Sequence, residues 1–500
     1  MKTNDYLIAI ATLIYSYLFY EQSGGINFFI FSVLLTAFCV FKDRGLLKQR
    51  AWIAAAAGNI LTGFAVFYYG TGFTIAANII SLLLLAAVSF NPAASLFVSA
   101  VNSLYSYLMT IPAMIVQVLV KGKEEDTGKG INLKKILLLI LPLLVCFIFF
   151  LLYREANPLF EEVTDKINLD FISADFILFT FFGLILLYGF FYQRAAKGLS
   201  EADSQNSNQL EFISEEKHQQ SFFASMVSIG SEIFTGMALL ILLNVLLLSV
   251  NGIDLYYLCF KQQLPGHLTL SQYLHDGTNA LIVSIVFAIG ILLVFFRGRL
   301  NFIAESRPLR WLAYVWVVQN IFMILSTANR NWFYISNFGL THKRLGVYVF
   351  LLLCITGLVT SLLKVAQVKS NWFLFRKNSW ACYAALIFVS LVNWDATIAA
   401  YNLDLAYTKN VKPDTYYLCQ LSYTALPVLQ HYYEMEQSGN TDTTFFDANL
   451  IAVMAFNSRE LLHEADYTGW QSGCIIKKQA LSRTPHFKKT ALNAKSLSNN

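Results

Sequence analysis

Charged residues are scarce in this chain of 500 residues, since Asp, Glu, Lys and Arg make up only 13% of it. Soluble globular domains carry about 25% charged residues, whereas here 56% of the residues are hydrophobic and the mean hydropathy is +0.52. This composition excludes an ordinary soluble protein and indicates that lipid surrounds most of the chain. The formal net charge of +5 is spread over connectors and the carboxyl-terminal end. The concentrated basic face of a nucleic-acid-binding protein is missing, so no nucleic-acid partner is expected.

Motifs of known chemistry are also sparse. The seven cysteines form no C-x-x-C pair and have no histidine at zinc spacing. The sequence contains neither a Gly-x-Ser-x-Gly elbow nor an H-E-x-x-H helix. We therefore expect no metal and no cofactor, and transport or binding in place of catalysis. Cys259, Cys419 and Cys474 fall in segments that we expect outside the membrane, which leaves room for one disulfide.

What the sequence does contain is a series of eleven apolar runs. About twenty apolar residues cross a bilayer as a helix, because lipid offers no partner for an unpaired backbone N–H or C=O. The runs predict an all-α fold, a polytopic transmembrane helix bundle of about 11 spans with a small helical extramembrane region at the carboxyl end. The expected spans are 6–20, 26–41, 52–69, 73–90, 136–153, 171–192, 226–250, 278–296, 311–327, 345–363 and 380–397.

Segment 91–120 is apolar as well, but it opens with Asn91-Pro92 and is interrupted by Pro112. If it lies along the cytoplasmic interface, the inward connectors hold 21 Lys and Arg residues and the outward connectors hold six. If it crosses the membrane, the counts become 11 inside and 16 outside. The positive-inside rule favours the interfacial helix. The amino terminus is then expected in the cytoplasm and the carboxyl terminus outside it.

The chain is expected to divide into three parts. Residues 1–402 form the helix bundle, in which 194–220 is a polar cytoplasmic loop. Residues 403–466 form a small helical extracytoplasmic region, since Pro413-Asp414 and Thr443 or Thr444 are typical helix starts. Residues 467–500 contain six Lys and Arg residues and no carboxylate. This composition predicts a disordered tail that contacts anionic lipid headgroups.

Cations are rare on the outward side, and three of them lie in the connector 328–346: Arg330, Lys343 and Arg344. Thr341 is expected to cap the following span, which puts Lys343 and Arg344 in a first helical turn, where the helix dipole disfavours positive charge. An anionic group should therefore compensate them. The candidates within the protein are Asp254, Asp276, Glu161, Glu162 and Asp395. We expect Asp395 to pair with Arg330 or Arg344.

These departures from the charge pattern define a candidate ligand site on the outward face. Its residues are Arg154, Asn157, Arg330, Lys343, Arg344 and Asp395. Arginine and lysine bind carboxylate and phosphate, so the ligand expected is an anionic lipid or a small acidic molecule. The alternative is that the same residues pair with each other and anchor helices without binding a ligand.

Four segments resemble a bacterial family of multi-pass membrane proteins catalogued as domain of unknown function 4173, a relative of 4153. They are Tyr153-Arg-Glu-Ala-Asn-Pro-Leu-Phe160, Phe338-Gly-Leu-Thr-His-Lys-Arg344 with Val347-Tyr348, Asn393-Trp-Asp-Ala-Thr-Ile-Ala-Ala-Tyr-Asn402, and Asp414-Thr-Tyr-Tyr-Leu-Cys-Gln-Leu-Ser422 continuing to Pro427. The resemblance covers about residues 52–429, and it departs from the family at Ala400, where a basic residue is expected. It implies an integral protein of the bacterial cytoplasmic membrane and supplies no substrate or catalytic residue.

Three functions remain open from the sequence. The first is transport or binding of an anionic group at the outward polar site. The second is a membrane scaffold or sensor without transport or catalytic activity. The third is an enzyme acting on envelope lipid or glycan, with His275, Asp276 or His342 as acid or base. The sequence does not indicate an oligomeric state.

Overall fold

The computed structural model describes residues 3–119, 149–150, 153–154, 156–157, 160, 174–210, 229–259, 270–296, 302–409, 412–438 and 445–483. Within these ranges it gives the backbone alone for 3, 115–119, 174, 229, 257–259, 270–282 and 304. Every named element in the described ranges is a helix, and the one β-bridge joins Gln209 to Lys369. The all-α prediction is confirmed. The chain forms two compact units: unit 1 is Met1–Ser200 with Leu461–Lys478, and unit 2 is Glu201–Glu460 with Gln479–Asn500.

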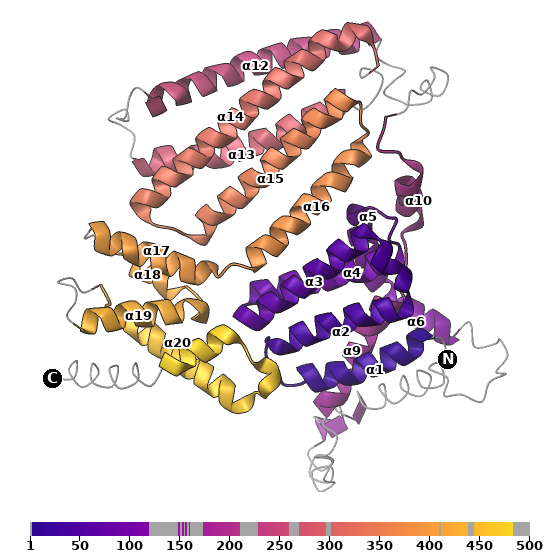
Figure 1. Cartoon of the computed structure of the whole chain (residues 1–500), viewed down its shortest axis with the longest axis vertical. Coiled ribbons are helices and arrows are strands. Elements are labelled where there is room, and N and C mark those ends of the chain that lie inside the picture. The colour runs from indigo at the N-terminus through magenta and orange to yellow at the C-terminus, as the bar shows by residue number, and fades with distance from the viewer. Residues whose placement is uncertain are drawn as a thin grey trace. The chain divides into compact units, whose positions relative to one another are not determined.

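Unit 1 is built mainly from antiparallel apolar helices (Figure 1). Helix α3 packs against α2 and α4, and α1 packs against α9. The α3–α4 turn follows from its sequence: Gly70 adopts a left-handed φ of 64°, and the Thr71 side chain then caps α4. The helices are α1 (Thr3–Phe19), α2 (Ile26–Lys42), η1 (Arg44–Lys48), α3 (Arg50–Tyr69), α4 (Gly72–Phe90), α5 (Leu96–Leu108), α6 (Thr110–Leu119), α9 (Ala174–Phe191) and η6 (Trp470–Ser472).

Helices α2, α3 and α4 are joined by a buried network of polar side chains. Asn78 of α4 donates to Ser32 Oγ at 2.9 Å and to Thr62 Oγ1 at 3.1 Å. Asn59 of α3 donates to the Ser32 carbonyl and to Thr36 Oγ1, both at 3.1 Å. Both asparagines are fully buried. In a membrane, apolar contact gives helices little reason to associate, so such bonds and close packing hold them together.

The carboxyl-terminal segment of unit 1 is fastened to the ends of these helices. The Ile26 N–H, at the start of α2, donates to the Gly473 carbonyl at 2.9 Å. The Cys474 thiol donates to the Tyr68 carbonyl, near the end of α3, at 3.1 Å. Residues 475–483 are helical. The disorder expected from 467 onward is therefore not seen up to Arg483, because this segment has backbone partners and buried side chains; residues 484–500 lie outside the described ranges.

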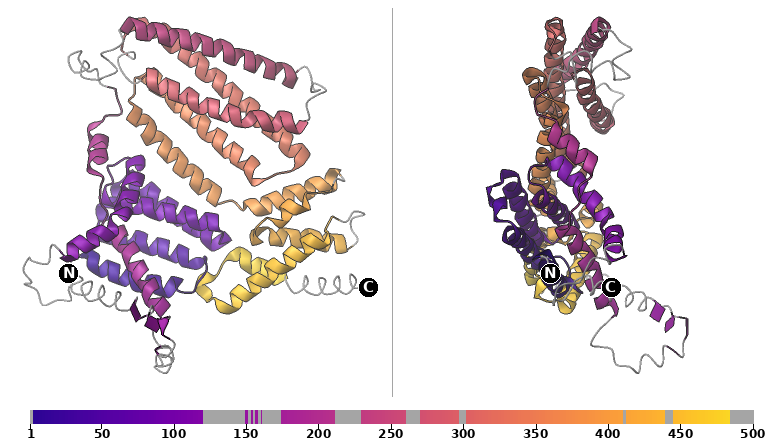
Figure 2. Two further views of the ribbon diagram at one scale, coloured as in Figure 1. Left: turned by 180° about the vertical axis from the view of Figure 1, so that it is seen from behind. Right: turned by 90° about the vertical axis from the view of Figure 1, so that its right-hand side faces the viewer.

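Unit 2 holds a sequence of long helices, most of which lie side by side in Figure 2. Helix α14 packs against α12, α13 and α15, and α15 packs against α16. The elements are α12 (Ile229–Cys259), α13 (Leu270–Phe295), η4 (Ala304–Ser306), α14 (Arg307–Phe338), α15 (His342–Gln367), α16 (Asn371–Ser390), α17 (Trp394–Lys409), α18 (Thr415–Cys419), η5 (Tyr423–Ala425), α19 (Leu426–Gln437) and α20 (Ala448–Tyr467), whose residues from Leu461 belong to unit 1.

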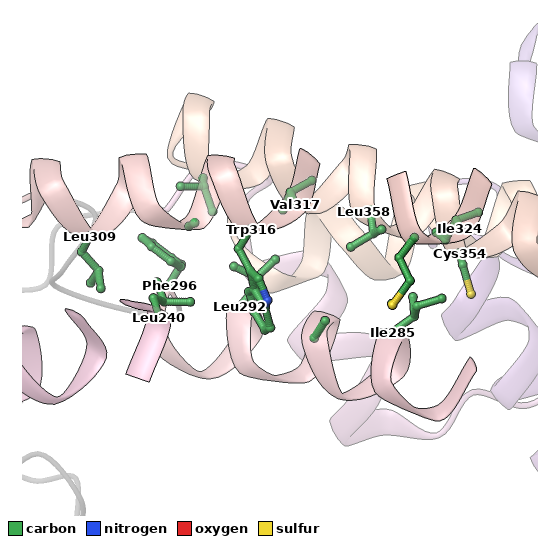
Figure 3. Close-up of a cluster of buried hydrophobic side chains, with 14 of the residues drawn as sticks. Leu240, Ile285, Leu292, Phe296, Leu309, Trp316, Val317, Ile324, Cys354 and Leu358 are labelled. Carbon is green, nitrogen blue, oxygen red and sulfur yellow. The ribbon is translucent and has the colours of Figure 1, made fainter. Parts of the chain in front are cut away.

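The core of unit 2 is a continuous apolar cluster contributed by α12, α13, α14 and α15. Figure 3 shows Leu292 and Phe296 directed toward Trp316 and Leu309. Phe296 and Leu309 are fully buried, and Trp316 is almost so. These side chains repeat at helical spacing within each apolar run, which explains how the runs bury one face against each other.

A polar seam runs along the contact between α12 and α14. Asn244 donates to the Leu312 carbonyl at 3.1 Å and accepts from Gln319 Nε2 at 2.8 Å. One heptad later, Asn251 donates to the Gln319 carbonyl at 3.0 Å. The partners advance in the same direction on both helices, so α12 and α14 are parallel. Polar residues at such seam positions fix the register of two helices at some cost in stability.

Part of the expected polar loop 194–220 is folded. Residues Lys197–Gln205 form helix α10, which begins in unit 1 and ends in unit 2. In unit 2, Arg376 Nη2 of α16 lies 2.9 Å from the buried carboxylate of Asp203. The Ser370 N–H donates to the Asn208 carbonyl at 3.0 Å. The segment therefore docks on the α15–α16 connection; residues 211–220 lie outside the described ranges.

Five helices in the described ranges are long and apolar enough to cross a membrane: Arg50–Tyr69, Gly72–Phe90, Gly230–Tyr256, Arg307–Phe338 and His342–Gln367. A sixth candidate is the pair Asn371–Ser390 and Trp394–Lys409, which is bent by 62°. The expected span 380–397 is thus not one straight helix. Asn393 accepts from the Ala396 N–H at 3.1 Å and starts a new helix there. The expected run 136–153 lies mostly outside the described ranges.

The sequence leaves open one disulfide among Cys259, Cys419 and Cys474. Cys419 and Cys474 are both free thiols. The side chain of Cys259 lies outside the described set. Because either partner that Cys259 would need carries a free thiol, the structure contradicts a bridge among these three residues.

Replacing Asn78 by Ala should lower the stability of the protein by about 1–2 kcal/mol, because Ser32, Asn59 and Thr62 lose a shared buried partner. Thermal unfolding in detergent would measure the change. Thr356→Val is the matched control, since the Thr356 hydroxyl bonds to the Leu352 carbonyl of its own helix. Equal melting temperatures for the two variants would contradict the role given to the network.

Candidate functional site

The turn between α14 and α15 is held by a side chain from α17. The Leu340 N–H donates to Asn402 Oδ1 at 2.6 Å, and Asn402 Nδ2 donates to the Leu340 carbonyl at 3.0 Å. Gly339 has a φ of 80° and lies against Asn402, where a Cβ would meet Oδ1 at 2.6 Å. Thr341 then caps α15, accepting from the Arg344 N–H at 3.4 Å, as the sequence predicts.

His342, the first residue of α15, connects two further helices. Its Nε2 lies 2.6 Å from Asp395 Oδ1 of α17. Its Nδ1 lies 3.0 Å from the Tyr417 hydroxyl of α18, which also accepts from the His342 backbone N–H at 2.9 Å. In the tautomer that donates Nε2–H to Asp395, Nδ1 accepts the Tyr417 proton. Burial raises the pKa of the Tyr417 hydroxyl, which keeps it in the neutral donating form.

Asp395 also ties α17 to the segment after α18. Its other oxygen accepts from the Ser422 hydroxyl and from the Ser422 N–H. Asn393 donates to the Thr424 carbonyl at 3.2 Å. We call the set Leu340, His342, Asp395, Asn402, Tyr417 and Ser422 the motif cluster, because it joins three of the four segments on which the family resemblance depends. Figure 1 shows α17 and α18 beside the α14–α15 turn.

Arg344 forms hydrogen bonds within the same turn. Its guanidinium donates to the Phe338 carbonyl at 2.8 Å and to the Gly339 carbonyl. The guanidinium also lies 4.0 Å from the centre of the Tyr334 ring, a cation–π distance. Carbonyls at the end of α14 are the negative end of that helix, so Arg344 compensates the dipole of α14. This arrangement explains a cation in the first turn of α15.

Arg330 lies apart from the motif cluster, in the seam between α12 and α14. It forms a buried ion pair with Asp254, whose second oxygen accepts from the Ser326 hydroxyl at 2.8 Å. Arg330 is 8% exposed and Asp254 is 4% exposed, so the pair is removed from water. The expected pairing of Asp395 with Arg330 or Arg344 is therefore wrong. Asp254 is the partner of Arg330, and Asp395 is the partner of His342.

The remaining candidates have separate positions. Lys343 is exposed in the first turn of α15, next to His342, whose side chain is 53% exposed. Arg154 and Asn157 belong to unit 1, where Asn157 Oδ1 accepts from the Phe160 N–H at 3.4 Å. The described contacts thus bring together Arg344 and Asp395 around one turn, with Lys343 at its surface.

Sequence reasoning named His342 only as a possible acid or base and did not include Asn402 and Tyr417, although each of the three lies inside a segment that resembles the family. The signal was available: these segments carry hydrogen-bonding side chains at the ends of apolar runs. Glu161 and Glu162 lie outside the described ranges, and the side chains of His275 and Asp276 are not described. In the described part of the chain, no three His, Cys, Asp or Glu residues are placed to hold a metal ion.

Replacing Gly339 by Ala should destabilise the protein by about 1–3 kcal/mol, because φ and ψ there suit glycine and the new Cβ would strike Asn402. Gly346→Ala is the control on the same connector. Nothing lies within 4 Å of a Cβ at Gly346, and this helical position should tolerate or favour alanine. Thermal unfolding would compare them, and a harmless Gly339→Ala change would contradict the tight turn.

Replacing Arg330 by Met, or Asp254 by Leu, should each cost about 3–5 kcal/mol, because the remaining charge is left buried without its counter-ion. The double variant should recover much of that loss. A double-mutant cycle of thermal stability measures this coupling. Additive losses would show that the two residues act independently.

Comparison with known proteins follows the same segments. No curated protein and no solved structure matches the chain. One family model does match, that of the domain of unknown function DUF4153, over residues 7–432. This range contains all four segments on which the resemblance was based. Of the two related families named from the sequence, 4173 and 4153, the one whose model matches is 4153. With its apolar helices, the chain is a membrane protein of unknown activity, and it belongs to the DUF4153 family.

Proposed function

We propose that this protein binds an anionic group at Lys343, on the surface that this side chain shares with the neighbouring His342. The observation that carries the proposal is the exposure of these two side chains in the first turn of α15. Two contacts orient His342, from Asp395 and Tyr417, so one side of the surface is preorganised. Preorganised groups bind more tightly because less freedom is lost on binding.

The proposal assigns different roles to the six candidate residues. Lys343 contacts the ligand, whereas Arg344 and Asp395 hold the turn that presents it. Arg330 holds α12 against α14 through Asp254. Arg154 and Asn157 stay candidates without an assigned role. Transport of the bound group, in place of binding alone, would require a path through the bundle that includes the polar seam.

The same proposal places the protein in the cytoplasmic membrane of a bacterium, with about eleven spans. The charge pattern supports an amino terminus in the cytoplasm and the α14–α15 turn on the outer side. The domain division is kept as a proposal: a bundle in 1–402, an extracytoplasmic helical region in 403–466 and a basic tail in 467–500. Within the bundle, 91–120 would lie along the inner interface.

A scaffold or sensor without a ligand is the second candidate. It is favoured by the engagement of both Arg330 and Arg344 with groups of the protein itself. Under this function the motif cluster would serve to hold α17 and α18 on the end of the bundle. Lys343 would then be a solvated side chain with no specific role.

Binding of phosphate groups separates the two functions. The full chain is placed in phosphatidylcholine nanodiscs, and thermal unfolding is followed with inorganic phosphate added, or with a minority of phosphatidylglycerol in the disc. At least one probe should stabilise the protein. Lys343→Gln should weaken the binding of that probe about ten-fold, because a charged hydrogen bond between the protein and the probe is lost. Lys412→Gln is the control, since Lys412 is exposed and lies 4.0 Å from Asp447.

The two outcomes are clear. A Lys343-dependent shift with either probe supports the anion site. If neither probe shifts the unfolding of the wild type, or if Lys343→Gln and Lys412→Gln respond as the wild type does, the anion site is refuted and the scaffold function stands.

A further inference from the structure

The depth of the proposed site in the membrane can be read from α14. This helix carries an exposed tryptophan toward each end: Trp311 is 68% exposed and Trp332 is 54% exposed. They are 21 positions apart on one helix, which corresponds to a rise of about 32 Å. The hydrocarbon core of a bilayer is about 30 Å thick, and tryptophan concentrates at its two boundaries. The two residues therefore mark the two interfaces.

The segment after Trp332 continues past the hydrocarbon. Helix α14 ends six residues later at Phe338, about 9 Å further along its axis. Phe333 and Phe338 are also about half exposed there. The turn and the first residues of α15 follow directly, so His342 and Lys343 lie at the depth of lipid headgroups. Aromatic side chains beside an exposed cation at this depth are typical of a protein surface in contact with lipid.

The charges around this surface suit an anion. Lys343 and Arg344 occupy the first turn of α15. Asp395 pairs with His342, and Asp414 caps α18 by accepting from the Tyr417 N–H at 3.0 Å. Arg344 is directed to carbonyls of α14. Lys343 is thus the cation of this turn that is left exposed to the headgroup layer.

We propose that the anionic group recognised at Lys343, beside His342, is the phosphate of an anionic membrane lipid, with Trp332 and Phe338 in contact with the same lipid layer. This inference rests on the anion site proposed above and names its ligand. A lipid phosphate is held at this depth by its acyl chains, whereas a free phosphate or small acid has to be drawn from water. The bilayer therefore supplies the ligand at high local concentration.

Quenching of Trp332 fluorescence by brominated lipids tests the proposal. The full chain is placed in phosphatidylcholine nanodiscs that contain a minority of brominated phosphatidylglycerol or of brominated phosphatidylcholine. The difference between the wild type and Trp332→Phe isolates the Trp332 signal. We expect brominated phosphatidylglycerol to quench this signal more strongly than brominated phosphatidylcholine does. The preference should fall as salt screens the attraction.

Substitutions then assign the preference to the site. In the Lys343→Gln background the preference for phosphatidylglycerol should fall about five-fold, the effect expected for one lysine near an anionic surface. Lys412→Gln should leave it unchanged. Lys343 is exposed, so its substitution should not disturb folding, and an unchanged melting temperature in plain phosphatidylcholine would verify this.

Failure of the lipid inference is distinguishable from failure of the anion site. Equal quenching by the two lipids, together with stabilisation by inorganic phosphate that depends on Lys343, would refute the lipid as the ligand but support the anion site. Equal quenching with no response to phosphate would overturn both. A phosphatidylglycerol preference that Lys343→Gln leaves intact would place the lipid elsewhere and also overturn the inference.

Discussion

Hydrogen bonding inside an apolar bundle is the constraint on which the rest of this structure depends. Lipid offers no partner to a polar side chain, so each one must find a partner within the protein, and an asparagine finds it mainly on a neighbouring helix. Asn59 and Asn78 meet this requirement in unit 1, and Asn244 and Asn251 meet it in unit 2. Because such partners must be in register, these few residues determine which helices are neighbours and how they are aligned.

The ends of helices were more predictable from the sequence than their contacts. The bounds expected at 69 and 73, and the cap expected at Thr341, agree with the helices, and the structure attributes the first two to Gly70 and Thr71, since capping depends on a few adjacent residues. The break at Asn393 was missed because the apolar run continues through it. Asp254 was among the carboxylates considered for Arg330, but Asp395 was preferred, because Asp254 is 76 residues away and composition does not reveal which helices become neighbours.

The candidate site changed in a similar way. The sequence located the right connector, because cations on the cation-poor side are unusual. From the sequence, all three cations were expected to bind one ligand. In the structure they have three different environments: Arg330 is in a buried ion pair, Arg344 binds carbonyls at the end of the preceding helix, and Lys343 is exposed. Three segments far apart in the sequence, all within the range that matches the DUF4153 family, meet through His342, Asp395, Asn402 and Tyr417.

Unit 1 is assembled from both ends of the sequence, since Leu461–Lys478 belongs to it together with Met1–Ser200. During synthesis, helices near the amino terminus enter the membrane early. The residues that hydrogen-bond to the start of α2 and the end of α3, Gly473 and Cys474, are made some 400 residues later. At a synthesis rate of about 5–20 residues per second, these contacts can form only tens of seconds after the early helices have been made. Residues Glu201–Glu460 of unit 2 are therefore synthesised while unit 1 is still incomplete, and unit 1 can close only after Leu461–Lys478 has been made.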